Sequence, residues 1–293
     1  MKLILKFNIA LLAVGAIGFA ATAAVSYRML QDKARAETLQ NARVMMEAAA
    51  ATRSYTNSNI VHLLATQMKY SFLPESVPSF AAAEVFNSLH TKLPDYTYKD
   101  AVLNPTNPRD RTTDWEADIV NQFRQNPTQN DEAELVGVRD TPSGRSLYLA
   151  RAITIRDKNC LACHDTAATA PKTMIDRYGG SNGFGWKHNE TVGAQIVSVP
   201  EQVHAERAYA TFVAFMTSMG IVFGAVFITL NLMLTFLVIR PISRLSEIAE
   251  RVSLGDATAP EFNARGSDEI GGLGRAFARM RTSLQKAIDL IEQ

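Results

Sequence analysis

The sequence predicts an α+β protein in which two membrane-spanning helices flank a mixed α/β external domain, followed by a parallel four-helix coiled coil in a dimer. Three observations support this: two long uncharged apolar runs, strand-like alternation in the polar region between them, and heptad spacing in the tail. The expected boundaries are residues 7–27 and 212–239 for the membrane helices, 28–206 for the external domain and 240–293 for the tail.

Composition excludes several classes of protein. The 293 residues include 30 Lys and Arg against 29 Asp and Glu, giving a formal net charge of +1. This balance does not fit a broadly basic nucleic-acid binder, so no nucleic-acid partner is expected. The chain has only two cysteines. A disulfide-stapled scaffold and a metal site with four cysteine ligands are therefore excluded.

The first apolar run lies between Lys6 and Arg28 and reads FNIALLAVGAIGFAATAAVSY. With a rise of about 1.5 Å per helical residue, it is long enough to cross a hydrocarbon core of about 30 Å. The alternative is a cleaved signal peptide, because the Ala-Thr-Ala sequence at 21–23 resembles a cleavage site. The run continues without a turn signal into a helix-forming segment, which favours an uncleaved anchor.

The second apolar run, residues 212–239, contains no charged residue and is expected to span the membrane. Gly220 and Gly224 form a GxxxG pair, which lets helices approach closely in lipid, although chance is an equal explanation in such a segment.

Charges beside the two apolar runs predict the orientation in the membrane. Lys2 and Lys6 precede the first run, and Arg240 and Arg244 follow the second. Because Lys and Arg favour the cytoplasmic side, both termini are expected in the cytoplasm of a bacterial inner membrane. The intervening domain is then periplasmic.

Cys160, Cys163 and His164 form the pentapeptide CLACH, the attachment pattern of a c-type haem. The two thiols can bind the vinyl groups of one covalent haem c, and the adjacent imidazole can bind its iron as the proximal ligand. A zinc site would need two further ligands. A thioredoxin-like CxxC would be followed by an amphipathic helix, which DTAATAPK does not resemble.

The distal iron ligand stays open at the level of sequence. The segment before residue 72 has the composition of a long helix that could cover the haem. His62 is the first choice as distal ligand, Met68 the second, and no protein ligand the third. An open distal site would suit gas binding, whereas a filled one would suit a redox change. The remaining candidates are His90, His188, His204, Met45 and Met46.

The external domain contains strand-like segments at 134–139 and 146–155, joined by the turn sequence DTPSG, and a third at 191–200. A helix is expected around Trp115 and Phe123, after a loop rich in Pro and Asn.

Apolar residues of the tail recur at spacings of three and four. After Pro241, which suits a first helical position, the first series begins at Ile242, and the second continues to Ile291. One such helix cannot bury its stripe alone, so two helices per chain are expected to form a four-helix bundle in a homodimer. A single amphipathic helix on the membrane is the alternative. The positions are Ile242, Leu245, Ala249 and Val252, then Ile270, Leu273, Phe277, Met280, Leu284, Ala287 and Ile291.

Residues 240–286 resemble a HAMP linker, through Pro241, Leu245, Gly255, Glu261 and the sequence Asp-Glu-Ile-Gly at 268–271. Residues from about 30 to 206 resemble a family of extracytoplasmic c-haem sensor domains, long catalogued as a domain of unknown function. The matching stretches are 98–120, SLYLAR, CLACH and 182–200. This second resemblance implies a PAS-like fold and transfers only Cys160, Cys163 and His164 as haem-binding residues.

Together these features predict a haem-based redox or gas sensor that signals through the HAMP linker. The expected partner is a cytoplasmic output protein such as a kinase or a chemoreceptor-type protein, and the chain itself is not expected to be an enzyme. The alternative is a membrane-tethered c-type cytochrome for periplasmic electron transfer. Two further alternatives are a haem peroxidase and a receptor whose CxxCH carries no haem.

Overall fold

The computed structural model describes residues 3–126, 133–141, 144–256, 258–262 and 268–291. The chain divides into two compact units, which are described separately. One comprises residues 28–211, and the other comprises residues 1–27 and 212–293. The turn residues 142–143 and parts of the predicted tail, residues 257, 263–267 and 292–293, lie outside the described residues.

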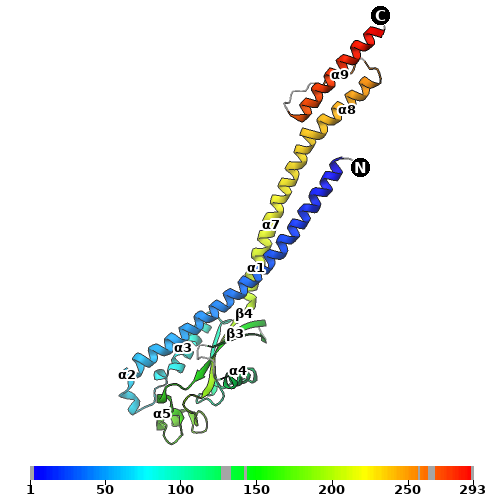
Figure 1. Cartoon of the computed structure of the whole chain (residues 1–293). Helices are drawn as coiled ribbons and strands as arrows, with labels where there is room; N and C mark the ends of the chain where they lie inside the picture. The colour runs from blue at the N-terminus through cyan, green and yellow to red at the C-terminus, as the bar shows by residue number, and fades with distance from the viewer. Residues whose placement is uncertain (1–2, 127–132, 142–143, 257, 263–267, 292–293) are drawn as a thin grey trace. The chain divides into compact units, whose positions relative to one another are not determined.

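Two long helices carry the apolar runs (Figure 1). The first, α1 (Leu3–Tyr55), continues through a π-helical turn (Thr56–Ile60) into α2 (Val61–Leu64). The second, α7 (Glu201–Met233), continues through a π-helical segment (Leu234–Ile239). Both helices are long and apolar enough to cross a membrane, as the sequence predicts.

The two apolar runs contact each other inside their unit. The Phe223 ring lies against Gly15, where a Cβ atom would come within 2.0 Å of it. Tyr27 and Phe212 form an edge-to-face pair with ring centres 5.6 Å apart. Gly220 and Gly224 have no neighbouring atom within 4 Å of a Cβ position, so the predicted close approach through this pair stays a prediction.

Residues 28–211 contain a four-stranded antiparallel sheet in the order β1-β4-β3-β2. The predicted hairpin and third strand are confirmed, whereas the edge strand β1 was not predicted. The strands are β1 (Thr97–Val102), β2 (Glu134–Thr141), β3 (Gly144–Thr154) and β4 (Thr191–Pro200). The α+β class is thus confirmed.

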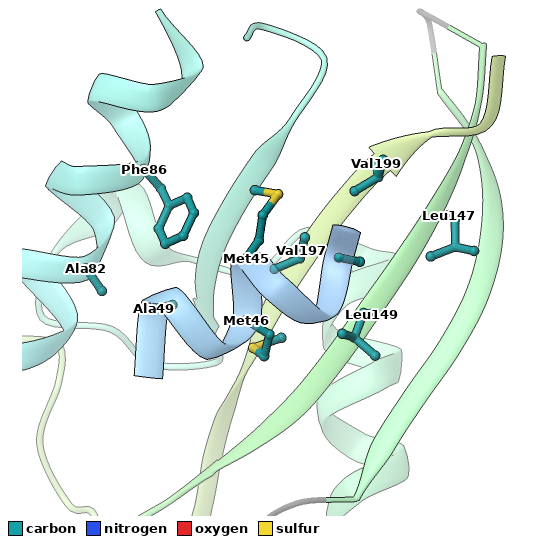
Figure 2. Packing of buried hydrophobic residues seen from close by; sticks show 10 residues of the cluster. Met45, Met46, Ala49, Ala82, Phe86, Leu147, Leu149, Val197 and Val199 are labelled. Atoms are coloured by element: carbon teal, nitrogen blue, oxygen red, sulfur yellow. The ribbon is translucent and has the colours of Figure 1, made fainter. Parts of the chain in front are cut away.

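Helices cover both faces of the sheet. On one face, α1 and α3 (Pro78–His90) pack their small and flexible side chains against the aliphatic residues of β3 and β4 (Figure 2). Met46, Leu147, Leu149, Val197 and Val199 form the centre of this cluster. The unbranched Met45 and Met46 side chains are flexible and can fill irregular space between the helix and the sheet.

On the other face, α4 (Asp114–Gln125) packs Ile119, Val120 and Phe123 against Ala150 and Ile196. This is the helix predicted around Trp115 and Phe123. It begins with a capping box, in which the Thr113 side chain accepts from the backbone and the Glu116 carboxylate accepts from the Thr113 amide at 2.7 Å.

The tail forms two helices, α8 (Arg240–Ser253) and α9 (Glu269–Ile291). Gly255 adopts φ +86° just after α8, a conformation that a residue with a side chain rarely adopts. The Asp268 carboxylate accepts from the Gly271 amide at 2.8 Å and caps α9. Of the predicted seam, Leu245 is buried within one chain, whereas Leu273, Met280 and Leu284 are exposed, and the side chains of Ala287 and Ile291 lie outside the described residues.

The smaller elements lie mostly between β3 and β4 and before β1. They are η2 (Gln67–Lys69), η3 (Pro74–Ser76), η4 (Pro108–Asp110), η5 (Lys158–Cys160), α5 (Leu161–His164) and α6 (Lys172–Tyr178).

Candidate functional site

The CxxCH segment occupies η5 and α5, directly after β3. The Asp157 carboxylate accepts from the Asn159 amide at 2.8 Å and starts the helical turn. Cys160 and Leu161 pack against a small cluster of buried residues: Val102 of β1, Ile155 just after β3, and Val192 of β4. The segment is therefore attached to the same end of three strands, and its position depends on theirs.

His164 is held by two loops that are distant in sequence. Its Nδ1 lies 2.7 Å from the Gly183 carbonyl oxygen and 3.4 Å from Thr106 Oγ1. Its ring stacks on Trp186 with centres 3.9 Å apart and an interplanar angle of 11°. The Trp186 amide also donates to the His164 carbonyl at 3.2 Å. The carbonyl acceptor requires a proton on Nδ1, so Nε2 keeps its lone pair available for a metal.

Gly183 is specifically required for this arrangement. It adopts φ +84°, and a Cβ atom there would lie 2.0 Å from Thr106 Oγ1 and 2.8 Å from the Thr106 backbone. Its amide donates to the Asn104 side chain at 3.2 Å. A side chain at 183 would therefore force apart the loop that supplies the His164 acceptor.

Burial determines the ionisation of the three CxxCH residues. It lowers the pKa of His164, and the hydrogen bond with Gly183 only partly opposes this. The imidazole is therefore neutral at pH 7, the form that binds metals. Burial also raises the pKa of Cys160, with Asp157 adding to the effect, and raises the pKa of Cys163. Both thiols stay protonated, unlike the low-pKa thiols of redox CxxC enzymes.

The residues fit a covalently attached haem. The two free cysteines are half-buried, one helical turn apart, and directly precede a neutral histidine with an available Nε2. In addition, the Trp186 Nε1 is buried and has no hydrogen-bond partner among the described residues. A buried indole N–H normally finds an acceptor, and a haem propionate is one group that would provide it.

Among the described residues, neither of the two distal candidates forms a hydrogen bond with the CxxCH segment. His62 is exposed on α2, and Met68 is half-buried in η2. The chain just beyond them does approach the segment after the CxxCH, because the Phe72 amide donates to Thr173 Oγ1 at 2.7 Å and Phe72 meets Tyr178 edge-on. Either residue stays a prediction as the distal ligand.

Four residues around His164 were not found by sequence reasoning: Asn104, Thr106, Gly183 and Trp186. They lie in the stretches 98–120 and 182–200, which carry the family resemblance. That resemblance was the available signal, but it transferred only the three CxxCH residues and did not single out these four.

Two apolar helices, an α+β domain that carries a CxxCH segment, and paired amphipathic helices after the second apolar run define a transmembrane sensor receptor. Residues 31–200 match the family model Tll0287-like: Tll0287, and residues 233–286 match the HAMP domain. The chain therefore belongs to the Tll0287-like family and carries a HAMP domain.

A curated relative is Sensor protein ChvG of Agrobacterium fabrum, which is 39% identical over 104 residues. The match covers 34% of this chain and 16% of that protein, so the chain matches about a sixth of its relative's length. The crystal structure of the cyanobacterial heme-protein Tll0287 superimposes with a TM-score of 0.43 and 16% identity, covering 56% of this chain and 95% of that chain.

The expectation that the protein is not an enzyme is wrong as it stands. The finding that overturns it is the match with ChvG, a longer sensor protein of which only a small share aligns here. Modules of this kind occur inside larger signalling proteins, so their own chemistry does not decide whether the protein that contains them is an enzyme. The assignment as a non-enzyme is withdrawn.

Proposed function

We propose that this receptor senses redox state or a diatomic gas through one haem c, bound covalently by Cys160 and Cys163 with His164 as proximal iron ligand. The observation that carries the proposal is the 2.7 Å contact between His164 Nδ1 and the Gly183 carbonyl, directly beside two free cysteines. It selects the tautomer whose Nε2 faces away from the protein acceptor. When bound, the haem supplies an iron whose ligation or oxidation state can change.

The chain's own residues orient and tune this site. Gly183 accepts from His164 and thereby increases the electron density on Nε2, while Trp186 restricts rotation of the imidazole by stacking on it. Burial keeps the imidazole neutral, so no proton competes for Nε2 near pH 7.

Chain connectivity supports a route for the signal. The loop that holds His164 leads through Glu190, whose carbonyl accepts from the Ile155 amide at 2.9 Å, into the central strand β4. This strand ends at Pro200, and α7 begins at Glu201. A displacement of the His164 loop would therefore act on β4 and α7, and α7 leads to the HAMP domain, which acts as a bistable element in this proposal.

The first experiment tests the covalent haem. The full chain is expressed with a cytochrome c maturation system, and haem is stained after denaturing electrophoresis. We expect a stained band for the natural chain, a reduced band for C160S or C163S alone, and none for the double variant. As a matched control, Met174→Leu changes a buried residue outside the CxxCH and leaves the stain unchanged. A natural chain without stain or Soret absorbance refutes the proposal.

The second experiment tests sensing and topology. A kinase module fused after Gln293 reports output while redox potential, oxygen and nitric oxide are varied, and His164→Ala abolishes the response. Unchanged output of this variant under every condition would refute the sensing role.

The topology is tested with a phosphatase that is active only in the periplasm. The phosphatase is expected to be active when it is fused within residues 28–206 and inactive when it is fused to either terminus of the chain. Cross-linking across Met280→Cys tests the homodimer.

A further inference from the structure

A cavity of about 320 Å³ lies along β1, one of the two edge strands of the sheet. Its lining comes from α3, β1, η4, α4, β2 and β4, and it includes neither the CxxCH residues nor those that contact His164. The volume falls in the range of small-molecule sites, about 300–1,000 Å³. This cavity is a second feature of the domain that the haem proposal does not use.

Arg139 of β2 contributes an unsatisfied donor to this cavity. Its guanidinium carbon lies 3.9 Å from the ring centre of Trp115, which in turn packs against Tyr148. Its Nε is buried and has no hydrogen-bond partner among the described residues. Stacking on an indole stabilises the cation, but the ring face offers no acceptor in the plane of the guanidinium. Stacking on Trp115 thus fixes the plane of the Arg139 guanidinium, and its Nε has no acceptor among the described residues.

The other charged groups of the cavity neutralise one another. Each lining carboxylate has a basic partner: Asp100 with Arg53 at 2.6 Å, Glu116 with Lys99 at 2.7 Å, and Asp110 with Arg109 at 3.5 Å. Arg139 forms no ion pair within the described residues. A half-buried cation that has no carboxylate partner among the described residues would be stabilised by a bound anion.

We propose that this cavity binds a small organic carboxylate, with the Arg139 guanidinium holding the carboxylate group. Arginine matches a carboxylate through two parallel N–H···O bonds, and stacking on Trp115 fixes the plane in which they form. Trp115 and Ile196 offer apolar contact for the rest of the ligand, while Ser198 and Thr97 contribute polar lining. These apolar contacts favour an organic acid over an inorganic anion.

The site has a direct connection to the signalling helix. Ile196 and Ser198 belong to β4, the strand that is followed by α7 without an intervening loop. A bound carboxylate would therefore act on the same strand as the His164 loop, but from a separate position. The receptor would have a second chemical input that does not require the haem.

The test uses the full chain in detergent and calorimetric titration with benzoate, succinate, benzamide and inorganic phosphate. We expect benzoate or succinate to bind and the neutral benzamide and phosphate not to bind. Arg139→Gln is expected to weaken carboxylate binding by at least about tenfold, and Arg139→Lys to weaken it less, since it keeps the charge but loses the planar donors. Arg145→Gln, on a side chain that is 67% exposed, is the matched control and binds normally.

Three results overturn the proposal: no heat with either carboxylate, equal binding by Arg139→Gln, or phosphate binding in preference to both acids. The melting temperature and the Soret spectrum are recorded for every variant. An unchanged spectrum in Arg139→Gln, together with lost carboxylate binding, supports a site separate from the haem. Failure of the carboxylate site leaves the haem stain unaffected, so the two proposals are tested independently.

Discussion

The two faces of the sheet use the same edge strand differently. Asp100 of β1 pairs with Arg53 of α1 on one face, and its neighbour Lys99 pairs with Glu116 of α4 on the other. The Asp100 side chain is only 4% exposed and also accepts from the Tyr98 hydroxyl at 2.7 Å. The Lys99 side chain is 29% exposed, and its amine also donates to the Arg111 carbonyl.

The difference shows how each helix is held. The α1 residues that precede Arg53 and pack in the core are mainly Ala and Met. The buried Arg53–Asp100 ion pair therefore provides the directional interaction that fixes α1 against β1. Burial disfavours the Arg53 cation, but Asp100 and Tyr98 outweigh this and raise the pKa of Arg53. In contrast, α4 packs larger side chains and has its own capping box, so its ion pair matters less. Three substitutions test this difference, in order of decreasing expected effect, and a fourth tests a carboxyl group next to the same strand.

Asp100→Ala should cause the largest loss. It removes the carboxylate that pairs with Arg53 and accepts from Tyr98, and Arg53 keeps only a neutral acceptor, the Gln195 side-chain oxygen at 3.1 Å, among the described residues. Removing one partner of a buried ion pair costs about 3–5 kcal/mol. The melting temperature of the full chain in detergent reports the effect. Asp95→Ala, on an exposed residue of the same segment, is the control and should change little. Equal melting temperatures for the two variants would mean that the pair does not hold α1.

Glu116→Ala should cost less, about 1.5–3 kcal/mol, because Lys99 remains partly solvated and can reach water. The substitution removes two contacts of the Glu116 carboxylate, the ion pair with Lys99 and the hydrogen bond from the Thr113 amide. Glu116→Gln separates them, since its amide oxygen can still accept from the Thr113 amide while the charge that pairs with Lys99 is lost. If Glu116→Gln costs as much as Glu116→Ala, the cap contributes nothing.

Thr113→Ala isolates the other half of the capping box and should cost about 1 kcal/mol, since one amide of the first turn loses its acceptor. Thermal melting followed by far-ultraviolet circular dichroism measures the change. Thr113→Ser retains the hydroxyl and should restore the natural stability. A serine variant as unstable as the alanine variant would contradict a capping role.

Sequence patterns located the parts of the molecule that depend on local chemistry. Alternation in β3 and β4 predicted two strands, and CLACH predicted the site, because both signals lie within a few consecutive residues. The edge strand β1 escaped prediction, since Lys99 and Asp100 interrupt its apolar pattern, and only helices from elsewhere in the chain neutralise them. Gly183 and Thr106 meet His164 across 19 and 58 positions, and no local pattern encodes such contacts.

The fourth expected effect concerns Asp110, which lines the cavity along β1, and this effect disappears at low pH. Burial raises the pKa of Asp110 to about 6, an effect that Arg109 and Lys99 partly offset and Asp100 increases. Between about pH 3.8 and pH 6, Asp110 therefore keeps its proton in the folded protein, whereas it has lost this proton in the unfolded chain. The stability contributed by the protonated form is therefore present at low pH and is lost as the pH rises through about 6.

Asp110→Asn imitates the protonated carboxyl at every pH. We expect it to raise the unfolding free energy by about 1 kcal/mol at neutral pH, a value reduced for solvent screening because 24% of the side chain is exposed. At a pH near 4 the two proteins should have equal stability, because the natural residue is then protonated in the fold. Asp118→Asn, on the exposed side of α4, should show no such crossover. A gain that persists undiminished at low pH would show that the amide stabilises this edge of the sheet for a reason other than the charge it removes.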